Sequence, residues 1–153
     1  MLRPLATLIN RTLRLYWRIR RPRTFGVRAV VVGRDDRLLL VKHTYDRYWY
    51  LPGGGRKEAE PVEGALAREL KEELGIREAR VERRLGVYFS EREGKRDTID
   101  VFVVRASVVE RLQRIEIAEA RWFEIGELPP DISPATLRRI EEYRGAREIG
   151  GAW

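Results

Sequence analysis

Four glutamates stand close together in the first half of the chain, just after a run of glycines. They are Glu60, Glu69, Glu72 and Glu73. On a helix, like charges three or four residues apart repel by about 0.2–0.5 kcal/mol per pair. Carboxylate oxygens are the ligands that hard divalent cations such as Mg²⁺ take in proteins, usually together with substrate phosphates. The cluster indicates a cation site, and ion pairs with Arg68 and Lys71 are the competing explanation.

The segment that carries three of these glutamates has the pattern of an amphipathic helix. Its apolar positions recur every four residues, at Val62, Leu66, Leu70 and Leu74. On a helical wheel with Val62 at 0° and an advance of 100° per residue, these apolar positions cover about 0° to 120°. On the same wheel Glu69 falls at about 340° and Glu73 at about 20°. The acidic strip therefore borders the core face instead of lying opposite to it. Partly buried carboxylates are costly without compensation, so a bound cation is the simpler explanation.

Gly53, Gly54 and Gly55 directly precede this helix. Glycine has no side chain, so the backbone of such a loop can closely approach a ligand or a neighbouring group. Alone, three glycines most often mark a turn. Next to the acidic cluster, they indicate a site built from main-chain and carboxylate oxygens.

Composition narrows the classes of protein and of site. The 153 residues fit one domain, and the absence of cysteine excludes disulfides and thiolate metal sites. The single histidine, His43, disfavours a zinc site built on imidazoles. Nothing suggests an oxidising compartment, so we expect a cytoplasmic protein. The net charge is +7, but residues 1–34 hold nine of the 31 basic residues and no acid, which leaves 22 basic against 24 acidic residues elsewhere. This near-neutral body makes nucleic acid an unlikely main ligand.

Residues 1–26 form a basic arm in which arginines alternate with apolar residues. The apolar set is Leu5, Leu8, Ile9, Leu13, Tyr16, Trp17 and Ile19. Its near-helical spacing predicts an amphipathic helix, and the recurring arginines exclude a transmembrane span or a secretory signal. Such a helix suits an anionic membrane surface or RNA, and would make the protein membrane-peripheral. The alternatives are packing on the domain, a homodimer contact, or an organellar transit peptide.

The elements that must position the site alternate between strands and helices. Pro61 is a good first-turn residue and Gly75 a stop for the acidic helix, and Ser133 with Pro134 starts a second helix. This order predicts an α/β fold with a mixed sheet covered on both faces, a domain over 27–147 and a loose tail over 148–153. Strands are expected over 27–33, 37–43, a short segment before the glycine loop, 79–90, 98–108 and 119–125.

The glycine loop and the acidic helix together match the signature of the Nudix hydrolases. That signature reads G-x5-E-x7-R-E-U-x-E-E-x-G-U, where U is bulky and aliphatic, and it runs here from Gly54 to Ile76. The flanking WYLPGG also resembles the usual approach to this motif, and the resemblance covers 27–147. Ala59 stands where a glycine often precedes the first glutamate, but this departure removes no ligand.

The resemblance implies a Nudix-type three-layer α/β/α sandwich that binds Mg²⁺ or Mn²⁺. It also implies hydrolysis of the pyrophosphate linkage in a nucleoside diphosphate joined to another group, with water as nucleophile. Glu72 and Glu73 match the family's main carboxylate ligands, and the Gly53 carbonyl matches a further ligand. Glu69 matches a position that binds metal in some members and orients or deprotonates the attacking water in others.

The remaining site residues follow from the same resemblance. Glu60 corresponds to the first glutamate of the motif, which usually lies near the metal cluster or hydrogen-bonds the loop. Arg68 resembles a partner that holds the glutamates in place. Glu116 occupies a region where some members supply an extra ligand or base, and Glu119 is the competing choice.

Several other residues are weaker candidates. His43 ends a predicted strand and could face the site, although a lone histidine more often packs or lies at the surface. Aromatic residues near the glycine loop could stack a base or simply pack; they are Tyr45, Tyr48, Trp49 and Tyr50. Arg92, Lys95 and Arg96 could meet phosphates, but a solvated hairpin tip is the more common meaning of such a run.

The substrate is predicted only as a class. Residues 91–94 read Glu-Arg-Glu-Gly, without the proline or tyrosine that marks members specific for ADP-ribose or diadenosine polyphosphates. A nucleoside diphosphate derivative is therefore the expected substrate. A catalytically idle Nudix domain that senses a nucleotide, or an RNA- or membrane-associated regulator, are the alternatives. The complete set of carboxylates favours an enzyme.

Overall fold

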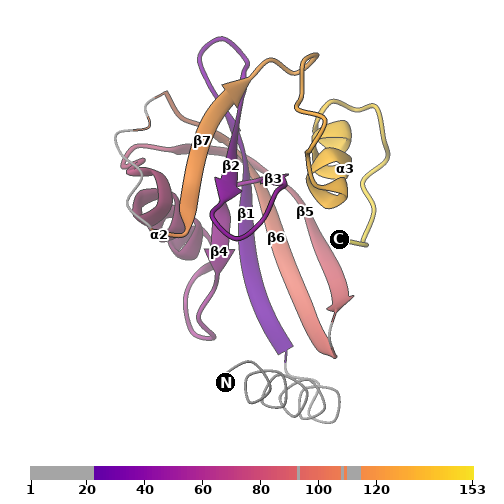
Figure 1. The fold of residues 1–153 in the computed structure, drawn as a ribbon. Helices are drawn as coiled ribbons and strands as arrows, with labels where there is room; N and C mark the ends of the chain where they lie inside the picture. Colours follow the sequence, from indigo (N-terminus) through magenta and orange to yellow (C-terminus); the bar gives the residue numbers. More distant parts are fainter. Residues whose placement is uncertain (1–22, 93, 108, 110–114) are drawn as a thin grey trace, which may run out of the picture.

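The computed structural model describes residues 23–92, 94–107, 109 and 115–153 (Figure 1). The amphipathic helix predicted in the arm lies outside these residues, except for residues 23–26. The described elements are β1 (Arg23–Val32), β2 (Leu38–His43), β3 (Trp49–Tyr50), β4 (Gly53–Gly55), α2 (Val62–Leu74), β5 (Arg80–Arg92), β6 (Lys95–Arg105), β7 (Ile117–Phe123) and α3 (Pro134–Tyr143).

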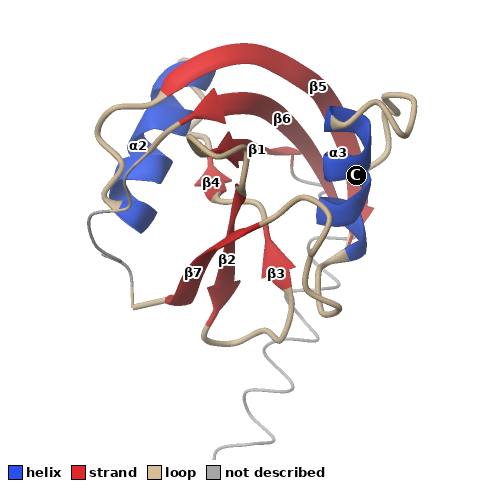
Figure 2. Cartoon of the chain, turned by 90° about the horizontal axis from the view of Figure 1, so that it is seen from above, coloured by secondary structure: helices blue, strands red, loops and turns tan. Residues whose placement is uncertain are grey.

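The strands form one mixed sheet in the order β3-β2-β1-β6-β5, with β4 paired to β1 and β7 paired to β2. The β1–β6 pair is parallel and the other pairs are antiparallel. Helices α2 and α3 lie on opposite sides of the sheet (Figures 1 and 2). The predicted α/β fold with a mixed sheet covered on both faces is therefore confirmed.

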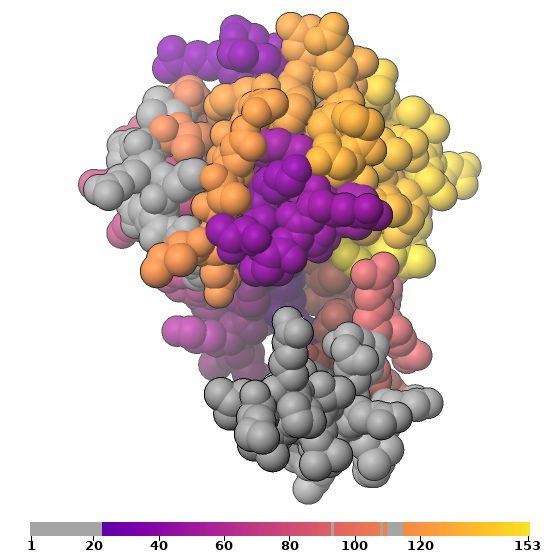
Figure 3. Space-filling model, in the orientation of Figure 1, coloured from indigo at the N-terminus to yellow at the C-terminus, as the bar shows by residue number. Residues whose placement is uncertain are grey.

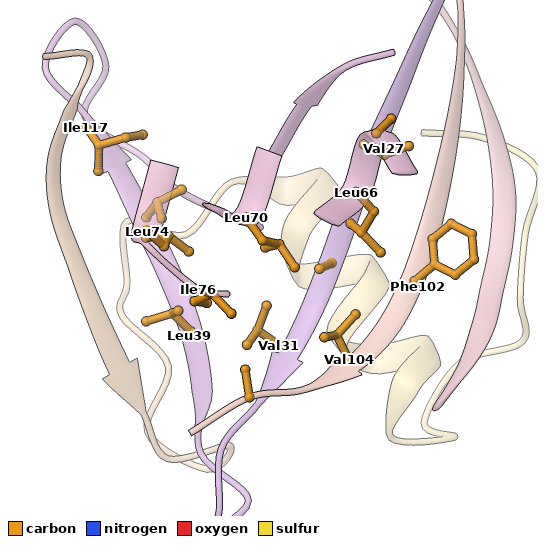
Figure 4. Packing of buried hydrophobic residues seen from close by; sticks show 14 residues of the cluster. Val27, Val31, Leu39, Leu66, Leu70, Leu74, Ile76, Phe102, Val104 and Ile117 are labelled. Carbon is orange, nitrogen blue, oxygen red and sulfur yellow. The ribbon is translucent and has the colours of Figure 1, made fainter. Parts of the chain in front are cut away.

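The core has two parts, one on each face of the sheet, because alternate residues of a strand point to opposite faces. On β1, Val27 and Val31 join the part that packs under α2, whereas Val30 and Val32 join the part under α3. All four are fully buried, which explains the near-continuous apolar run of this strand. Figure 4 shows the first part, in which the leucines of α2 meet β1 and β6.

The predicted starts of both helices and the predicted end of α2 are confirmed. Pro61 directly precedes α2, and Gly75 ends it with a left-handed φ of 66°. The Gly75 N–H donates to the Lys71 carbonyl at 2.9 Å, and the Ile76 N–H donates to the Leu70 carbonyl at 3.3 Å. Ser133 caps α3, because its hydroxyl oxygen accepts a hydrogen bond of 3.1 Å from the Thr136 N–H.

Two segments differ from the sequence-based expectation. Strand β1 begins at Arg23, so residues 23–26 pair with β6 instead of breaking the chain before the sheet. The last residues are not a loose tail. The Phe89 N–H donates to the Gly151 carbonyl at 2.7 Å, and the Trp153 N–H donates to the Phe89 carbonyl at 3.0 Å. The reason is that β5 lies at the edge of the sheet and offers unpaired main-chain groups.

Within the described residues, no helix is long and apolar enough to cross a membrane.

Candidate active site

Helix α2 presents its glutamates to β4, the strand formed by the three glycines. Glu69 and Glu73 are each 3% exposed, as the helical pattern predicted. The Glu73 carboxylate accepts a hydrogen bond of 3.0 Å from the Gly53 N–H. Burial and this bond fix the Glu73 carboxylate next to the glycine backbone, where the Gly53 carbonyl was predicted to be a ligand.

Two of the three glycines are needed for this close approach. A β-carbon at Gly54 would lie 2.3 Å from Oε2 of Glu69. Gly53 has a φ of +135°, and a β-carbon there would lie 2.2 Å from the Val27 carbonyl oxygen. By contrast, a β-carbon at Gly55 would meet no atom within 4 Å. Glycine at position 54 therefore leaves room for the Glu69 carboxylate, whereas glycine at position 53 lets the loop pair closely with β1.

Arg68 joins the glutamates to each other. Its Nε and Nη2 donate to the two carboxylate oxygens of Glu60 at 2.7 and 2.9 Å. Its Nη1 donates to Glu69 at 2.7 Å and lies 3.5 Å from Glu72. Nη2 also donates to the Gly55 carbonyl at 2.9 Å. One guanidinium thus contacts three carboxylates and the glycine loop, which is the arrangement expected of a residue that holds the glutamates in place.

Glu60 has both carboxylate oxygens engaged by Arg68. It also accepts a hydrogen bond of 3.1 Å from the Lys57 N–H. The hydrogen bonds from Arg68 are the main reason that the pKa of Glu60 is lowered to about 2. Its contacts are those of a residue that fixes the loop, and metal binding by Glu60 would require breaking the pair with Arg68.

Glu72 and Glu116, the other predicted ligands, are more exposed. The Glu72 side chain is 42% exposed, so its carboxylate reaches solvent beside the buried pair. Glu116 is exposed and directly precedes β7, and its main-chain oxygen accepts a hydrogen bond of 2.9 Å from the Thr44 N–H. Its negative charge acts on His43 and Tyr45. Glu119, the competing choice, is paired with Arg121.

Aromatic side chains from the end of β2 and from β3 lie beside the carboxylates. The rings of His43 and Tyr45 are stacked at 5.1 Å, and the Tyr50 ring lies 5.5 Å from His43. Tyr45 is 71% exposed, so the ring face away from His43 is open to solvent. The β2–β3 segment that carries Tyr45 is at the surface in Figure 3.

The other weak candidates have contacts that explain them. Trp49 is 4% exposed and packs edge-on against Phe123 with ring centroids 5.0 Å apart, so it belongs to the core. The Tyr48 hydroxyl accepts a hydrogen bond of 2.7 Å from Arg47. Arg96, at the β5–β6 turn, pairs with Glu91 at 3.8 Å.

One charged residue at the site was not identified from the sequence. Arg28 lies on β1, and its Nη1 donates to the carbonyls of Gly54 and Val27 at 3.1 and 2.9 Å. Burial lowers the pKa of Arg28, while the charges of Glu73 and Glu69 raise it. The sequence contains one indication of this residue, because Arg28 interrupts the otherwise apolar run of residues 27–32.

The donors at this site fit a hard divalent cation that keeps part of its water shell. Among the described residues, no group of three or more acidic, histidine or cysteine side chains is already arranged as a metal cage. The donors are carboxylate and main-chain oxygens, and the missing side chain at Gly54 lets the loop backbone approach the Glu69 carboxylate. Mg²⁺ typically takes one or two protein carboxylates and completes its shell with water and substrate phosphates.

Comparison with known proteins identifies the group of proteins to which this site belongs. The model of the NUDIX domain matches residues 22–143. An uncharacterized Nudix hydrolase of Pseudomonas aeruginosa is 45% identical over 88 residues, which are 57% of this chain and 52% of that protein. An ADP-ribose pyrophosphatase of Methanocaldococcus jannaschii is 32% identical over 104 residues, which are 65% of this chain and 61% of that protein. The chain thus spans only about half to three fifths of the length of these relatives.

A solved structure of a NUDIX hydrolase also resembles this chain. The crystal structure of a MutT NUDIX hydrolase from Burkholderia pseudomallei has a TM-score of 0.66 and 31% sequence identity to this chain. The match covers 78% of this chain and 97% of that one.

Proposed function

Since the chain belongs to the Nudix hydrolase family, we propose that it is a metal-dependent pyrophosphohydrolase. The proposed substrate is a nucleoside diphosphate linked to another group, and water is the nucleophile. The observation that carries this proposal is the packing of two buried carboxylates, Glu69 and Glu73, against the glycine loop, where a side chain at position 54 would displace the Glu69 carboxylate. The ADP-ribose pyrophosphatase among the relatives acts on a compound of this class.

In this proposal, Glu72, Glu73 and the Gly53 carbonyl hold Mg²⁺ or Mn²⁺. A divalent ion, when bound, would neutralise phosphate charge and lower the pKa of a water molecule. The Gly53 N–H keeps the Glu73 carboxylate beside the Gly53 backbone. Gly53 would therefore position the Glu73 ligand and also supply its own carbonyl oxygen as a ligand. Glu72 completes the set from the solvent-exposed side of α2.

Glu69 is proposed to bind the metal or to orient the attacking water and accept its proton. It is buried next to Gly54, and its Oε1 is held by Arg68 at 2.7 Å. A carboxylate held in one orientation and shielded from bulk water is well suited to align a water molecule. Glu116 is proposed as a further ligand or as an alternative base, because its charge reaches His43 and Tyr45 beside the same site.

Arg68 is proposed to position the glutamates and to offset part of their mutual repulsion. Its bonds with Glu60 and Gly55 fasten the loop, and its bonds with Glu69 and Glu72 fasten the helix. The same guanidinium therefore holds both halves of the site. Carboxylate oxygens gathered in this way are the donors that a hard divalent ion takes.

The test compares Glu73→Gln with Glu63→Gln, an exposed acid in the first turn of the same helix. Wild-type protein is first screened, by chromatography of the phosphorylated products, for hydrolysis of nucleoside diphosphate sugars, dinucleoside polyphosphates, nucleoside triphosphates and capped RNA, each with Mg²⁺ and Mn²⁺. We expect Glu73→Gln to lower turnover of the best substrate by at least roughly 100-fold, since it removes a ligand. Glu63→Gln should have wild-type activity.

Two outcomes would contradict the proposal. Equal activity in Glu73→Gln and wild type would remove the site assignment. Binding of a nucleotide by the wild-type protein without turnover of any compound in the screen would instead identify a sensor.

The role of the arm is a separate proposal, because residues 1–22 lie outside the described structure. We propose that the protein is cytoplasmic and that the arm either attaches it to an anionic membrane surface or makes a homodimer or domain contact. Deletion of residues 1–22 should leave turnover unchanged and abolish co-sedimentation with anionic vesicles if the arm serves localisation. Loss of soluble folded protein would show that the arm packs on the domain. A change from dimer to monomer would show that the arm makes a homodimer contact.

A further inference from the structure

Arg28 is a charged side chain in the middle of a buried strand. Its neighbours Val27 and Ala29 are fully buried. Placing a guanidinium in such surroundings carries a desolvation cost that must be offset by hydrogen bonds or by nearby negative charge. An apolar residue at position 28 would suit the buried strand equally well, so the presence of a charged arginine there needs a separate explanation.

The hydrogen bonds of Arg28 use only part of its donor capacity. A guanidinium has five N–H donors. Nη1 donates to the carbonyls of Gly54 and Val27. Within the described part of the chain, Nε and Nη2 have no hydrogen bond, and the guanidinium has no carboxylate within ion-pair distance. One edge of the guanidinium is therefore held by the glycine loop, and the other edge remains available to an anion.

The charged and titratable groups around Arg28 come from three elements. Burial is the largest influence on the pKa of Arg28 and lowers it, whereas Glu73 and Glu69 on α2, Tyr45 after β2 and Asp97 on β6 raise it. Burial is also the largest cause that lowers the pKa of His43, and the positive charge of Arg28 lowers it further. The bond to the Gly54 carbonyl holds the Arg28 guanidinium at the glycine loop, beside which Glu69 and Glu73 are buried. In a nucleoside diphosphate, the phosphates must occupy the space between the metal and the base.

We propose that Arg28 is a phosphate-binding residue of this site, whose free guanidinium edge donates hydrogen bonds to non-bridging oxygens of the substrate's diphosphate. This inference rests on the proposed function, because the diphosphate is the ligand it assumes. Arginine suits the role, since its planar fork can donate two parallel hydrogen bonds to one phosphate. The bond from Nη1 to the Gly54 carbonyl holds that fork in place before a substrate arrives.

The competing explanation is that Arg28 only fastens the glycine loop to β1. That role predicts a different result, because a loosened loop would disturb Glu69 and Glu73 and so weaken metal binding and stability. A phosphate-binding role predicts a loss of affinity for the diphosphate while metal binding remains. The two roles are therefore separable by measurements that do not depend on turnover.

The experiment uses the full chain with Arg28→Lys, Arg28→Gln and the control Arg23→Gln. Arg23 is an exposed arginine at the start of the same strand. The probe is methylenediphosphonate, which has two phosphoryl groups, no base and no hydrolysable bridge. Its affinity is measured by calorimetry with Mg²⁺ present, and Mn²⁺ affinity without the probe is measured by electron paramagnetic resonance.

We expect Arg28→Gln to weaken probe binding by about 10- to 100-fold, the range for a charge-assisted hydrogen bond, with Mn²⁺ affinity and melting temperature close to wild type. Arg28→Lys should recover part of the affinity, and Arg23→Gln should match wild type. Equal probe affinity in Arg28→Gln and Arg23→Gln would overturn the proposal. A parallel loss of Mn²⁺ affinity or stability in both Arg28 variants would overturn it in favour of loop fastening.

The screen on wild-type protein separates this inference from the proposed function. Failure of the wild-type protein to hydrolyse any substrate would refute the proposed activity. Normal probe binding that depends on Arg28 would still support the phosphate-binding role in that case.

Discussion

Two clusters of arginine and glutamate lie on opposite faces of the sheet, and they differ in how charge is balanced. Next to α2, Arg68 contacts three glutamates and is 26% exposed. On α3, Arg139 pairs with Glu142, and the two side chains are 1% and 0% exposed. The first, open cluster lies partly at the surface and joins one guanidinium to several carboxylates, whereas the second, sealed cluster is a buried pair. Access from solvent is what makes the open cluster suitable for a cation.

The sealed cluster has a structural explanation in its contacts. Arg139 and Glu142 are joined at 2.9 and 3.0 Å, and Glu142 also accepts hydrogen bonds from the Tyr88 hydroxyl at 2.6 Å and the Gly150 N–H at 3.1 Å. The Arg139 guanidinium lies 3.8 Å from the centroid of the Tyr88 ring and 5.5 Å from that of Trp153. Burial and the bond to Glu142 raise the pKa of Tyr88, so its hydroxyl remains a donor. Similar residue types thus serve stability on one face and are proposed to serve chemistry on the other.

The largest expected effect concerns the sealed pair. Glu142→Gln should lower the free energy of unfolding by about 3–5 kcal/mol, because Arg139 would remain buried without a carboxylate. Urea unfolding followed by circular dichroism measures this change. The control is Glu141→Gln, whose side chain is 38% exposed and pairs with Arg147, and which should change stability by less than about 1 kcal/mol. Similar losses in both variants would show that burial is not the difference between the clusters.

The next effect concerns the loop beside the open cluster. Gly54→Ala should lower kcat/KM by about 100-fold, or about 2.7 kcal/mol in transition-state stabilisation, because the added methyl group would displace the Glu69 carboxylate. Gly55→Ala is the matched control, since no atom lies within 4 Å of its β-carbon. Both are measured in the assay with the best substrate from the screen. Wild-type activity in Gly54→Ala would mean that the orientation of Glu69 does not matter.

A smaller effect is expected from the docked chain end. Trp153→Ala should lower the free energy of unfolding by about 1–2 kcal/mol, since it removes the ring that lies over Arg139. Hydrolysis at 25 °C should be unchanged, because Trp153 belongs to the α3 side of the molecule. Glu148→Ala, in the exposed part of the same segment, serves as the control. A loss of activity without a loss of stability would contradict the separation of the two clusters.

The smallest effect should appear at the open cluster when no metal is added. Glu72→Gln should change the free energy of unfolding by no more than about 0.5 kcal/mol, because the Glu72 side chain is 42% exposed and lies 3.5 Å from Arg68. Thermal unfolding in the presence of a chelator measures this change. The same variant should bind Mn²⁺ more weakly than wild type. Strong destabilisation would place Glu72 in the same structural class as Glu142.

The sequence alone determined those features that depend on residues close together in the chain. The ends of α2 follow from Pro61 and Gly75, and the burial of Glu69 and Glu73 follows from helical spacing. The absence of cysteine already restricted any metal ligands to oxygens and to one histidine. In each case local geometry is sufficient, because a helix has a fixed advance per residue whatever packs against it.

Only the tertiary structure decided which distant residues meet. Arg28 reaches Gly54, 26 residues away, because β4 pairs with β1. The chain end docks on β5 because that strand is an unpaired edge with Tyr88 and Arg139 beside it. Such contacts depend on strand order and register, which many sequences with the same local pattern could satisfy differently. An arginine in an apolar strand and a short glycine-rich end therefore acquire their meaning only from their partners in the folded chain.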